Sequence, residues 1–260
     1  MKTKLFLLQL IISSLVIASI ICAQSLDELL SEGDQFADKF ENEKALAVFQ
    51  KAEKLYPDNW EVTWRISKAY VDIAEKMPNK TSEEENAQLA VYQKALDYAE
   101  KAVKLGPDKA NSYVRRAIAN GRIALFKGVF SVAGVVNSVR DDCLKAIQLG
   151  NGGNFVQAIA HYVLARTHAK ASEKWKPARS IIGLGWADNE VALKEYKKAI
   201  ELYPEYIMFY VDYAVSLGRE DKYKEAKAML NKALTLPIKN QEDPKKLEEA
   251  KSLLNKWKNE

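Results

Sequence analysis

The chain has 260 residues, of which 48% are hydrophobic and 28% are charged, and this composition excludes a disordered or collagen-like protein. Its 39 basic and 35 acidic residues are interspersed and leave a net charge of only +4. Because nucleic-acid-binding proteins gather basic charge on one face or in one run, this balance argues against a nucleic-acid partner.

Residues 1–23 have the pattern of an export signal. Two lysines precede a mostly apolar stretch, and Ala23 provides a small residue at the expected cleavage point. Cleavage would leave residues 24–260 as an exported protein, periplasmic or secreted, with no membrane span. Two alternatives stay open: lipidation of Cys22, and retention of the segment as an uncleaved membrane anchor, for which it has about the minimum length.

A spacing pattern that recurs along the rest of the chain predicts helices. A small or apolar residue is followed by others four and seven positions later, and by a proline about twelve positions later. Residues at these offsets share one helical face, and the proline ends the helix. Four copies are well kept, whereas the third of the five has lost its proline. The copies begin at Ala45, Ala95, Val139, Ala192 and Ala226.

A second amphipathic helix is predicted ahead of each copy, with a small residue where the two helices meet. Gly33 precedes Ala45 by twelve residues, and Ala214 precedes Ala226 by the same distance. These two units therefore have the 34-residue period of a tetratricopeptide repeat (TPR), and the three units between them are longer. In the fourth unit His161 takes the small position, which predicts an interface histidine.

These patterns predict an all-α protein with a TPR-like α-α superhelix, or solenoid, of about five helix pairs and a C-terminal capping helix. The whole of residues 24–260 forms a single repeat domain. The five repeats are expected at 26–59, 60–109, 110–153, 154–206 and 207–240, with the cap at 243–258. The cap begins at Asp243-Pro244, a favourable helix start, and its apolar stripe covers the exposed end of the last repeat.

The longer middle repeats carry a family resemblance. The segments concerned are Trp64-Arg65-Ile66-Ser67-Lys68-Ala69, Thr81 to Glu85, Tyr98 to Ala102, Lys145 to Ile147, the insertion with Trp175, and Pro237 to Leu254. In these segments and in the order of its insertions, the chain resembles the regulator of microtubule dynamics family over residues 60–256. The resemblance implies a TPR-like fold, a binding role and an association with microtubules. Given the export signal, we expect an exported, bacterial member, and carry over the fold and the binding role only.

The first helix of each pair lines the concave face of a TPR array, which predicts a partner-binding groove. The candidate groove residues lie on those helices beside the small positions, and they are Trp64, Lys68, Arg122, Tyr162, Arg166 and Arg219. An arginine fork can hold a carboxylate through two hydrogen bonds. We therefore expect Arg122, Arg166 and Arg219 to grip the acidic side chains or the terminal carboxylate of an extended peptide. In the competing interpretation these arginines pair with acids of the adjacent repeat or face water.

The insertion at residues 170–189 is the second candidate site. Tryptophan and arginine are common interface anchors, and the candidates here are Trp175, Lys176, Arg179 and Trp186. Two alternatives stay open for this segment. It folds back and plugs the groove, enclosing a small ligand beside Tyr162, or its tryptophans only fill space between repeats.

The sequence carries no motif for catalysis, for a metal or for a cofactor. His161 and His168 are seven residues apart, too far for the paired ligation that a spacing of four allows, and Cys143 takes a packing position. We therefore predict a non-catalytic protein-protein interaction scaffold whose groove binds a protein or extended peptide. The alternatives are an accessory protein that encloses a small ligand under the insertion, and a microtubule- or cytoskeleton-associated regulator as the family name implies.

Overall fold

The computed structural model describes residues 24–128 and 131–260, so the predicted export signal lies outside the described residues. Every element of the described residues is a helix, which confirms the predicted all-α class. In chain order they are α2 (Leu26–Asp38), α3 (Asn42–Leu55), α4 (Trp60–Lys76), α5 (Ser82–Leu105), α6 (Ala110–Lys127), α7 (Ala133–Leu149), α8 (Gly153–Ala171), α9 (Lys176–Ile181), α10 (Asn189–Leu202), α11 (Ile207–Gly218), α12 (Tyr223–Ala233) and α13 (Asp243–Lys256).

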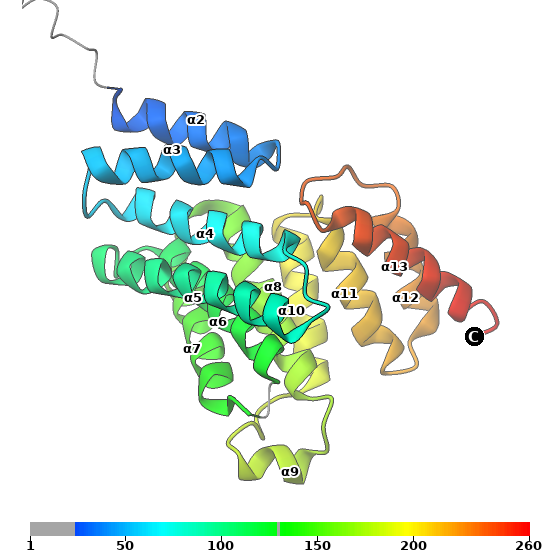
Figure 1. The fold of residues 1–260 in the computed structure, drawn as a ribbon. Coiled ribbons are helices and arrows are strands. Elements are labelled where there is room, and N and C mark those ends of the chain that lie inside the picture. Colours follow the sequence, from blue (N-terminus) through cyan, green and yellow to red (C-terminus); the bar gives the residue numbers. More distant parts are fainter. Residues whose placement is uncertain (1–23, 129–130) are drawn as a thin grey trace, which may run out of the picture.

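The described helices pack as five successive pairs, α2 with α3, α4 with α5, α6 with α7, α8 with α10, and α11 with α12. Each pair also contacts the next, and the first helices α4, α6, α8 and α11 touch in that order. Figure 1 shows the resulting curved stack, with α13 against the last pair and α9 projecting from one end. The predicted TPR-like superhelix is confirmed.

Side-chain caps fix where several helices begin. Ser25 and Glu28 form a reciprocal capping box at the start of α2, and Thr81 and Glu84 form another at the start of α5. These bonds satisfy backbone N–H groups that have no partner within the first helical turn. Asn59 caps α4 in a simpler way, through its side-chain oxygen.

Small residues let the paired helices approach closely. All five residues that begin the repeated pattern are buried, at 2% exposure or less. The Oγ of Ser67 in α4 donates a hydrogen bond of 2.7 Å to the carbonyl of Ala95 in α5, so a small position of one helix meets a pattern residue of its partner. His161 takes the corresponding place on α8, and its Nδ1 lies 2.6 Å from the carboxylate of Glu195 in the paired helix α10. It is an interface histidine, as predicted.

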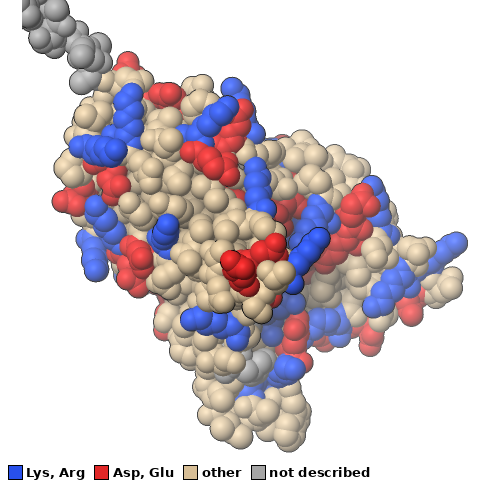
Figure 2. All heavy atoms as spheres, in the orientation of Figure 1, with Lys and Arg blue, Asp and Glu red and all other residues tan. Residues whose placement is uncertain are grey.

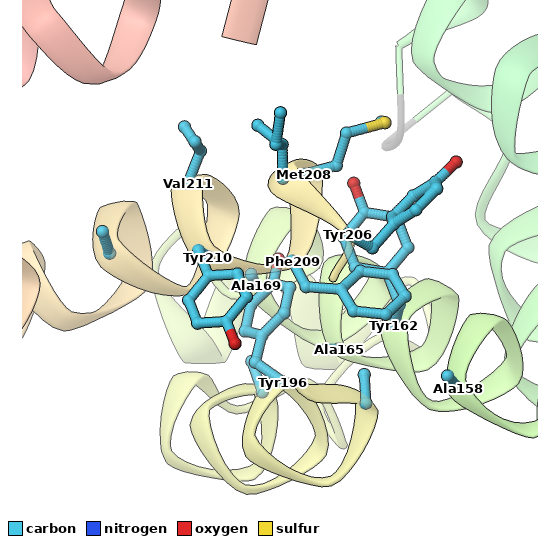
Figure 3. Packing of buried hydrophobic residues seen from close by; sticks show 14 of the residues in the cluster. Ala158, Tyr162, Ala165, Ala169, Tyr196, Tyr206, Met208, Phe209, Tyr210 and Val211 are labelled. Atoms are coloured by element: carbon cyan, nitrogen blue, oxygen red, sulfur yellow. The ribbon is translucent and has the colours of Figure 1, made fainter. Parts of the chain in front are cut away.

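The aromatic core of the C-terminal half joins α8, α10 and α11 (Figure 3). The ring of Phe209 lies 4.8 Å from those of Tyr162 and Tyr206, centroid to centroid, and Tyr196 packs 6.0 Å from Tyr162. All the buried hydrophobic residues of the described chain lie between Leu29 and Trp257. Within the described residues, these buried side chains pack each helix pair against the next.

The extra length of the middle repeats goes mainly into longer helices. Helices α4 to α8 have 17 to 24 residues each, whereas α11 and α12 have 12 and 11. Only the insertion between α8 and α10 forms an additional element, the short helix α9. The longer first helices extend the concave face, which is where the candidate site lies.

Gly33 provides a test of the close-packing requirement. A Cβ atom added at Gly33 would lie 2.2 Å from Cε1 of Phe49, whereas one added at Gly121, inside α6, would meet nothing within 4 Å. We expect Gly33→Ala to lower the free energy of unfolding by about 1–3 kcal/mol through overpacking. Gly121→Ala should leave it unchanged or raise it by up to about 1 kcal/mol, since alanine favours helix. Urea unfolding followed by circular dichroism measures both, and equal effects of the two changes would contradict the close-packing argument.

Candidate partner-binding cleft

Two adjoining cavities follow the concave face of the stack. One, of about 160 Å³, is lined mainly by apolar side chains of α6, α7 and α8, and we call it the apolar cavity. The other, of about 480 Å³, lies over α2, α4 and α6, and we call it the N-terminal cavity. Both are lined by Lys68, Asp72, Arg115 and Phe155. Because they share these walls, the two cavities form one continuous cleft.

Five of the six predicted groove residues line this cleft. Lys68, Arg122, Tyr162 and Arg166 line the apolar cavity, and Trp64 lines the N-terminal cavity together with Lys68. They come together because α4, α6 and α8 stack side by side with corresponding faces turned inward. The groove predicted from helical spacing therefore corresponds to a real concavity.

Arg219 does not line either cavity. Helix α11 ends at Gly218, so Arg219 follows the last helical turn instead of extending the inner face. Its guanidinium donates hydrogen bonds of 2.7 Å to the carbonyl of Ala169 and 3.1 Å to the side chains of Ser172 and Asn189. Arg219 thus ties the end of α8 to the start of α10.

The predicted groove arginines are paired within the protein. Arg122 of α6 forms an ion pair with buried Glu75 of α4, and Arg166 of α8 lies 3.1 Å from Asp212 of α11. Lys68 pairs within α4 with Asp72, at 2.5 Å. The structure thus matches the competing interpretation, in which arginines meet acids of the adjacent repeat. Figure 2 shows the same mixing of basic and acidic side chains over this face of the molecule.

Asp212 holds three elements together. Its carboxylate accepts hydrogen bonds of 2.7 Å from the hydroxyl of Tyr162 and 2.6 Å from Nζ of Lys246 in α13, and it faces Arg166. Burial acts to raise the pKa of Asp212, but the two cations and the two hydrogen bonds outweigh it and hold the pKa below its ordinary value of 3.8. The carboxylate is therefore ionised in the folded protein and anchors the cap to the repeat.

Arg115 is the cleft cation that lacks an acid. Its Nε donates a 3.2 Å hydrogen bond to the side-chain oxygen of Asn111, and its guanidinium lies 5.3 Å from the ring of Trp64. No carboxylate among the described residues lies within ion-pair distance of it, and its two terminal nitrogens donate no hydrogen bond to them. Burial lowers the pKa of Arg115, but a guanidinium stays charged at neutral pH. Arg115 therefore offers a half-buried positive charge at the junction of the two cavities.

Sequence reasoning missed Arg115 although the signal was present. On α6 the predicted groove residues include only Arg122, yet Arg115, Ile118 and Arg122 are spaced by three and four and so form one stripe of that helix. The same spacing relates Arg65, Lys68 and Asp72 on α4. Extending the stripe one turn toward the N-terminus would have included Arg115.

Trp64 is surrounded by positive charge. The guanidinium of Arg65 lies 4.3 Å from its ring and that of Arg115 lies 5.3 Å away. Such contacts favour a cation over an aromatic face. The indole Nε1 of Trp64 is buried and has no acceptor among the described residues. The N-terminal cavity thus combines an aromatic wall with hydrogen-bond donors.

Residues 237–242, which we call the strap, connect α12 to α13 and border the cleft. The side chain of Gln241 accepts a 2.7 Å hydrogen bond from Asn42 at the start of α3. It also donates hydrogen bonds to the Asp72 carbonyl at 2.7 Å and to the Glu75 carboxylate at 3.2 Å. Asn240 lines the apolar cavity. The strap therefore joins the C-terminal end of the array to its N-terminal pairs.

The four predicted insertion residues divide into two kinds. Arg179 is buried and donates hydrogen bonds to the carbonyls of Lys174 at 2.5 Å and Ala187 at 2.7 Å. Trp186 donates a 2.7 Å hydrogen bond from Nε1 to Asn137 and packs edge-on against His168. Trp175 and Lys176 are exposed to solvent instead. Lys170 is the one residue of the 170–189 segment that lines the apolar cavity, and none lines the N-terminal cavity, so the insertion does not plug the cleft.

The remaining chemistry of the described residues is structural. Cys143 is fully buried, as its packing position predicted, and burial raises the pKa of its thiol. In residues 24–128 and 131–260 no cluster of three or more histidine, cysteine, aspartate or glutamate side chains could hold a metal ion. Within the same ranges, none of the helices has both the length and the apolar character needed to span a bilayer.

Comparison with known sequences gives one family. The sequence model described as Regulator of microtubule dynamics protein 1-3 matches residues 29–258. A curated relative, Regulator of microtubule dynamics protein 3 from Rattus norvegicus, is 27% identical over 239 residues, which cover 88% of this chain and 49% of that protein. The chain thus spans about half the length of the curated relative that it matches.

Solved structures share the fold at low sequence identity. A thermophilic TPR protein from Thermus thermophilus is 16% identical with a TM-score of 0.61, over 88% of this chain and all of that one. An IFIT1 monomeric mutant with Gppp-AAAA is 14% identical with a TM-score of 0.51, over 90% of this chain and 55% of that one. At these identities the likeness supports the TPR-like fold and nothing about the ligand.

The Asp212 network predicts a large and pH-dependent contribution to stability. Asp212→Asn leaves Arg166 and Lys246 without their carboxylate, so we expect it to lower the free energy of unfolding by about 3–5 kcal/mol at neutral pH. A carboxyl whose folded pKa is depressed stabilises the fold above its unfolded pKa, and this contribution is lost as the pH falls through the folded pKa. The difference between the wild type and the variant should therefore shrink below pH 3.8.

Urea unfolding at several pH values measures this difference. The matched control is Glu249→Gln, because Glu249 also pairs with Lys246 but its side chain is 41% exposed. The control should cost less than about 1 kcal/mol. A loss for Asp212→Asn no larger than that of the control would contradict the assigned role.

Proposed function

The chain belongs to the regulator of microtubule dynamics family, and from this and the cleft we propose that it is a non-catalytic scaffold that binds an extended peptide segment of a partner protein. Its TPR-like helical repeat is a kind of scaffold suited to protein interaction. The single observation that carries the proposal is Arg115, a half-buried guanidinium in the cleft with no carboxylate within ion-pair distance among the described residues.

The charged side chains that line the cleft indicate which chemical groups the partner should present. A half-buried guanidinium whose terminal nitrogens donate no hydrogen bond to the described residues can bind a carboxylate of a ligand through charge-assisted hydrogen bonds. Arg122 and Arg166 already have such partners in Glu75 and Asp212. The partner should therefore present one acidic side chain or a terminal carboxylate to Arg115, close to the ring of Trp64.

The shape of the cleft favours a peptide over an enclosed small molecule. Small-molecule sites usually have volumes of roughly 300–1,000 Å³. The N-terminal cavity, at about 480 Å³, lies in this range, but it continues into the apolar cavity of about 160 Å³, so the cleft is extended along several helices and does not form one compact pocket. The apolar cavity suits one apolar side chain inserted between α6 and α8. The adjoining N-terminal cavity has room for the neighbouring residues of an extended chain. An acidic group beside an apolar side chain is thus the expected recognition element.

No residue that lines the cleft specifically supports either of the two other interpretations of the sequence. A small ligand enclosed under the insertion has no support in the cleft, since neither cavity is lined by Trp175 or Trp186. The name of the curated relative refers to microtubule dynamics, but this chain covers only 49% of that protein's length. Export to the periplasm or outside the cell remains a prediction from residues 1–23, and cell fractionation would test it.

Arg115→Gln tests the peptide proposal. Peptides selected from a random display library on residues 24–260 should combine an acidic residue or free carboxyl terminus with a large apolar residue. A hydrogen bond to a charged group contributes about 1.5–3 kcal/mol, so Arg115→Gln should weaken their binding at least about tenfold. Isothermal titration calorimetry measures the affinities of the selected peptides and of their charge-neutralised versions.

The matched control is Arg140→Gln, since Arg140 pairs with the exposed Asp141 and does not line the cleft. It should bind the same peptides as tightly as the unmodified protein. Equal binding by Arg115→Gln, or selected peptides without acidic groups, would refute the proposed anchor. Because Arg115 takes part in no ion pair among the described residues, Arg115→Gln should leave the thermal stability nearly unchanged, which separates a lost contact from a lost fold.

A further inference from the structure

The insertion ends in an exposed apolar tip, residues 175–182, which we call the α9 tip. Ile181 is 87% exposed, Trp175 is 76% exposed and Ile182 is 36% exposed. Figure 1 shows α9 projecting from one end of the stack, and Figure 2 shows that this end carries little charge on the face in view. Large apolar side chains gathered at a projection mark a contact surface.

The α9 tip is held in a defined shape. Buried Arg179 bonds to backbone carbonyls on both sides of the tip, at Lys174 and Ala187. Leu184 is fully buried beside α6 and α7, and Trp186 is bonded to Asn137. The segment therefore buries some of its apolar side chains firmly while it turns others outward. The packing of the loop therefore holds these apolar side chains in exposed positions.

The side chains next to the α9 tip are mainly basic, and the acid that follows the tip, Asp188, caps the start of α10. From Lys174 to Ala187 the sequence contains three basic residues and no acidic residue. Lys176 is exposed at the start of α9, and Lys127, at the end of α6 whose Ala124 packs in the same cluster as Leu184, is exposed too. The nearest acid before the tip, Glu173, is paired with Lys170. A partner with negative charge complements this surface.

The shape and the side chains favour a membrane over a protein. A protein partner would need a matching hollow for a convex tip, whereas the interface of a bilayer accommodates a projecting tryptophan or isoleucine without one. Tryptophan prefers the level of the lipid headgroups, and lysine can extend its charged end to the phosphates. Exposed apolar residues with a basic rim are the combination that binds anionic bilayers.

We propose that the α9 tip docks on an anionic lipid membrane, with Trp175, Ile181 and Ile182 entering the interface and Lys176 facing the headgroups. The docking is peripheral, and it is separate from the peptide-binding cleft because Trp175 to Ile182 line neither cavity.

Co-sedimentation with vesicles tests the proposal. The protein is residues 24–260, which contain the described packing, so that the apolar segment before residue 24 cannot itself bind lipid. Vesicles of phosphatidylcholine with phosphatidylserine should retain the protein, and those of phosphatidylcholine alone should retain at least about tenfold less. Raising the salt concentration should release it, because screening weakens the attraction.

The variants separate the apolar and the charged contributions. The double variant Trp175→Ala with Ile181→Ser should lose at least about tenfold in vesicle binding, and Lys176→Glu should lose several-fold at low salt only. The matched control is Leu55→Ser, which removes an apolar side chain of 49% exposure on α3 and should bind normally. All four side chains are solvent-exposed, so helical content by circular dichroism should not change.

Three outcomes would overturn the proposal. The first is undiminished vesicle binding by the double variant. The second is equal binding to vesicles with and without phosphatidylserine. The third is a dimer in light scattering that the double variant converts to a monomer, since the α9 tip would then be the contact between two copies of the chain.

Discussion

Close packing between paired helices depends on a small side chain where they meet, and the rest of this molecule follows from that requirement. Gly33 admits the ring of Phe49, and Ser67 brings α4 within a hydrogen bond of the α5 backbone. Gly218 plays the same part for the cap, since a Cβ there would lie 2.6 Å from the ring of Trp257. Repeated along the chain, this contact sets neighbouring pairs side by side and curves the stack.

The curvature creates the cleft and decides its electrostatics. First helices from successive repeats place their inner stripes next to one another, so a cation on one helix meets an acid on the next. Arg122 forms an ion pair with Glu75, and Arg166 forms one with Asp212. These pairs leave Arg115 as a half-buried charge with no carboxylate within ion-pair distance among the described residues. The proposed binding surface depends on this departure from charge pairing.

Two segments outside the regular pattern complete the molecule. The strap joins residues 199 positions apart, Asn42 and Gln241, and so links the last repeat to the first two. The insertion between α8 and α10 keeps away from the cleft, because Arg179, Leu184 and Trp186 fix it against α6 and α7. One segment borders the concave face and the other projects an apolar surface, so the two candidate functions lie in different places.

The sequence alone determined the helices, their pairing, the cap and the stripe that faces the cleft, because these depend on offsets of a few residues along one helix. Five of its six groove residues lie in the cleft, and Cys143 and His161 have the packing roles assigned to them. Arg219 lies outside the groove because α11 ends at Gly218, one residue before it, and the repeat spacing did not predict that end.

Only the tertiary structure decided which charges are paired and which apolar side chains are exposed. Arg122 and Glu75 are 47 residues apart, and neither position indicates the other. Trp175 and Trp186 looked equivalent in the sequence, yet one faces solvent and the other is bonded to Asn137. Helical periodicity fixes the face on which a residue lies, but its partner is set by the stacking of distant repeats, and that is a property of the folded chain.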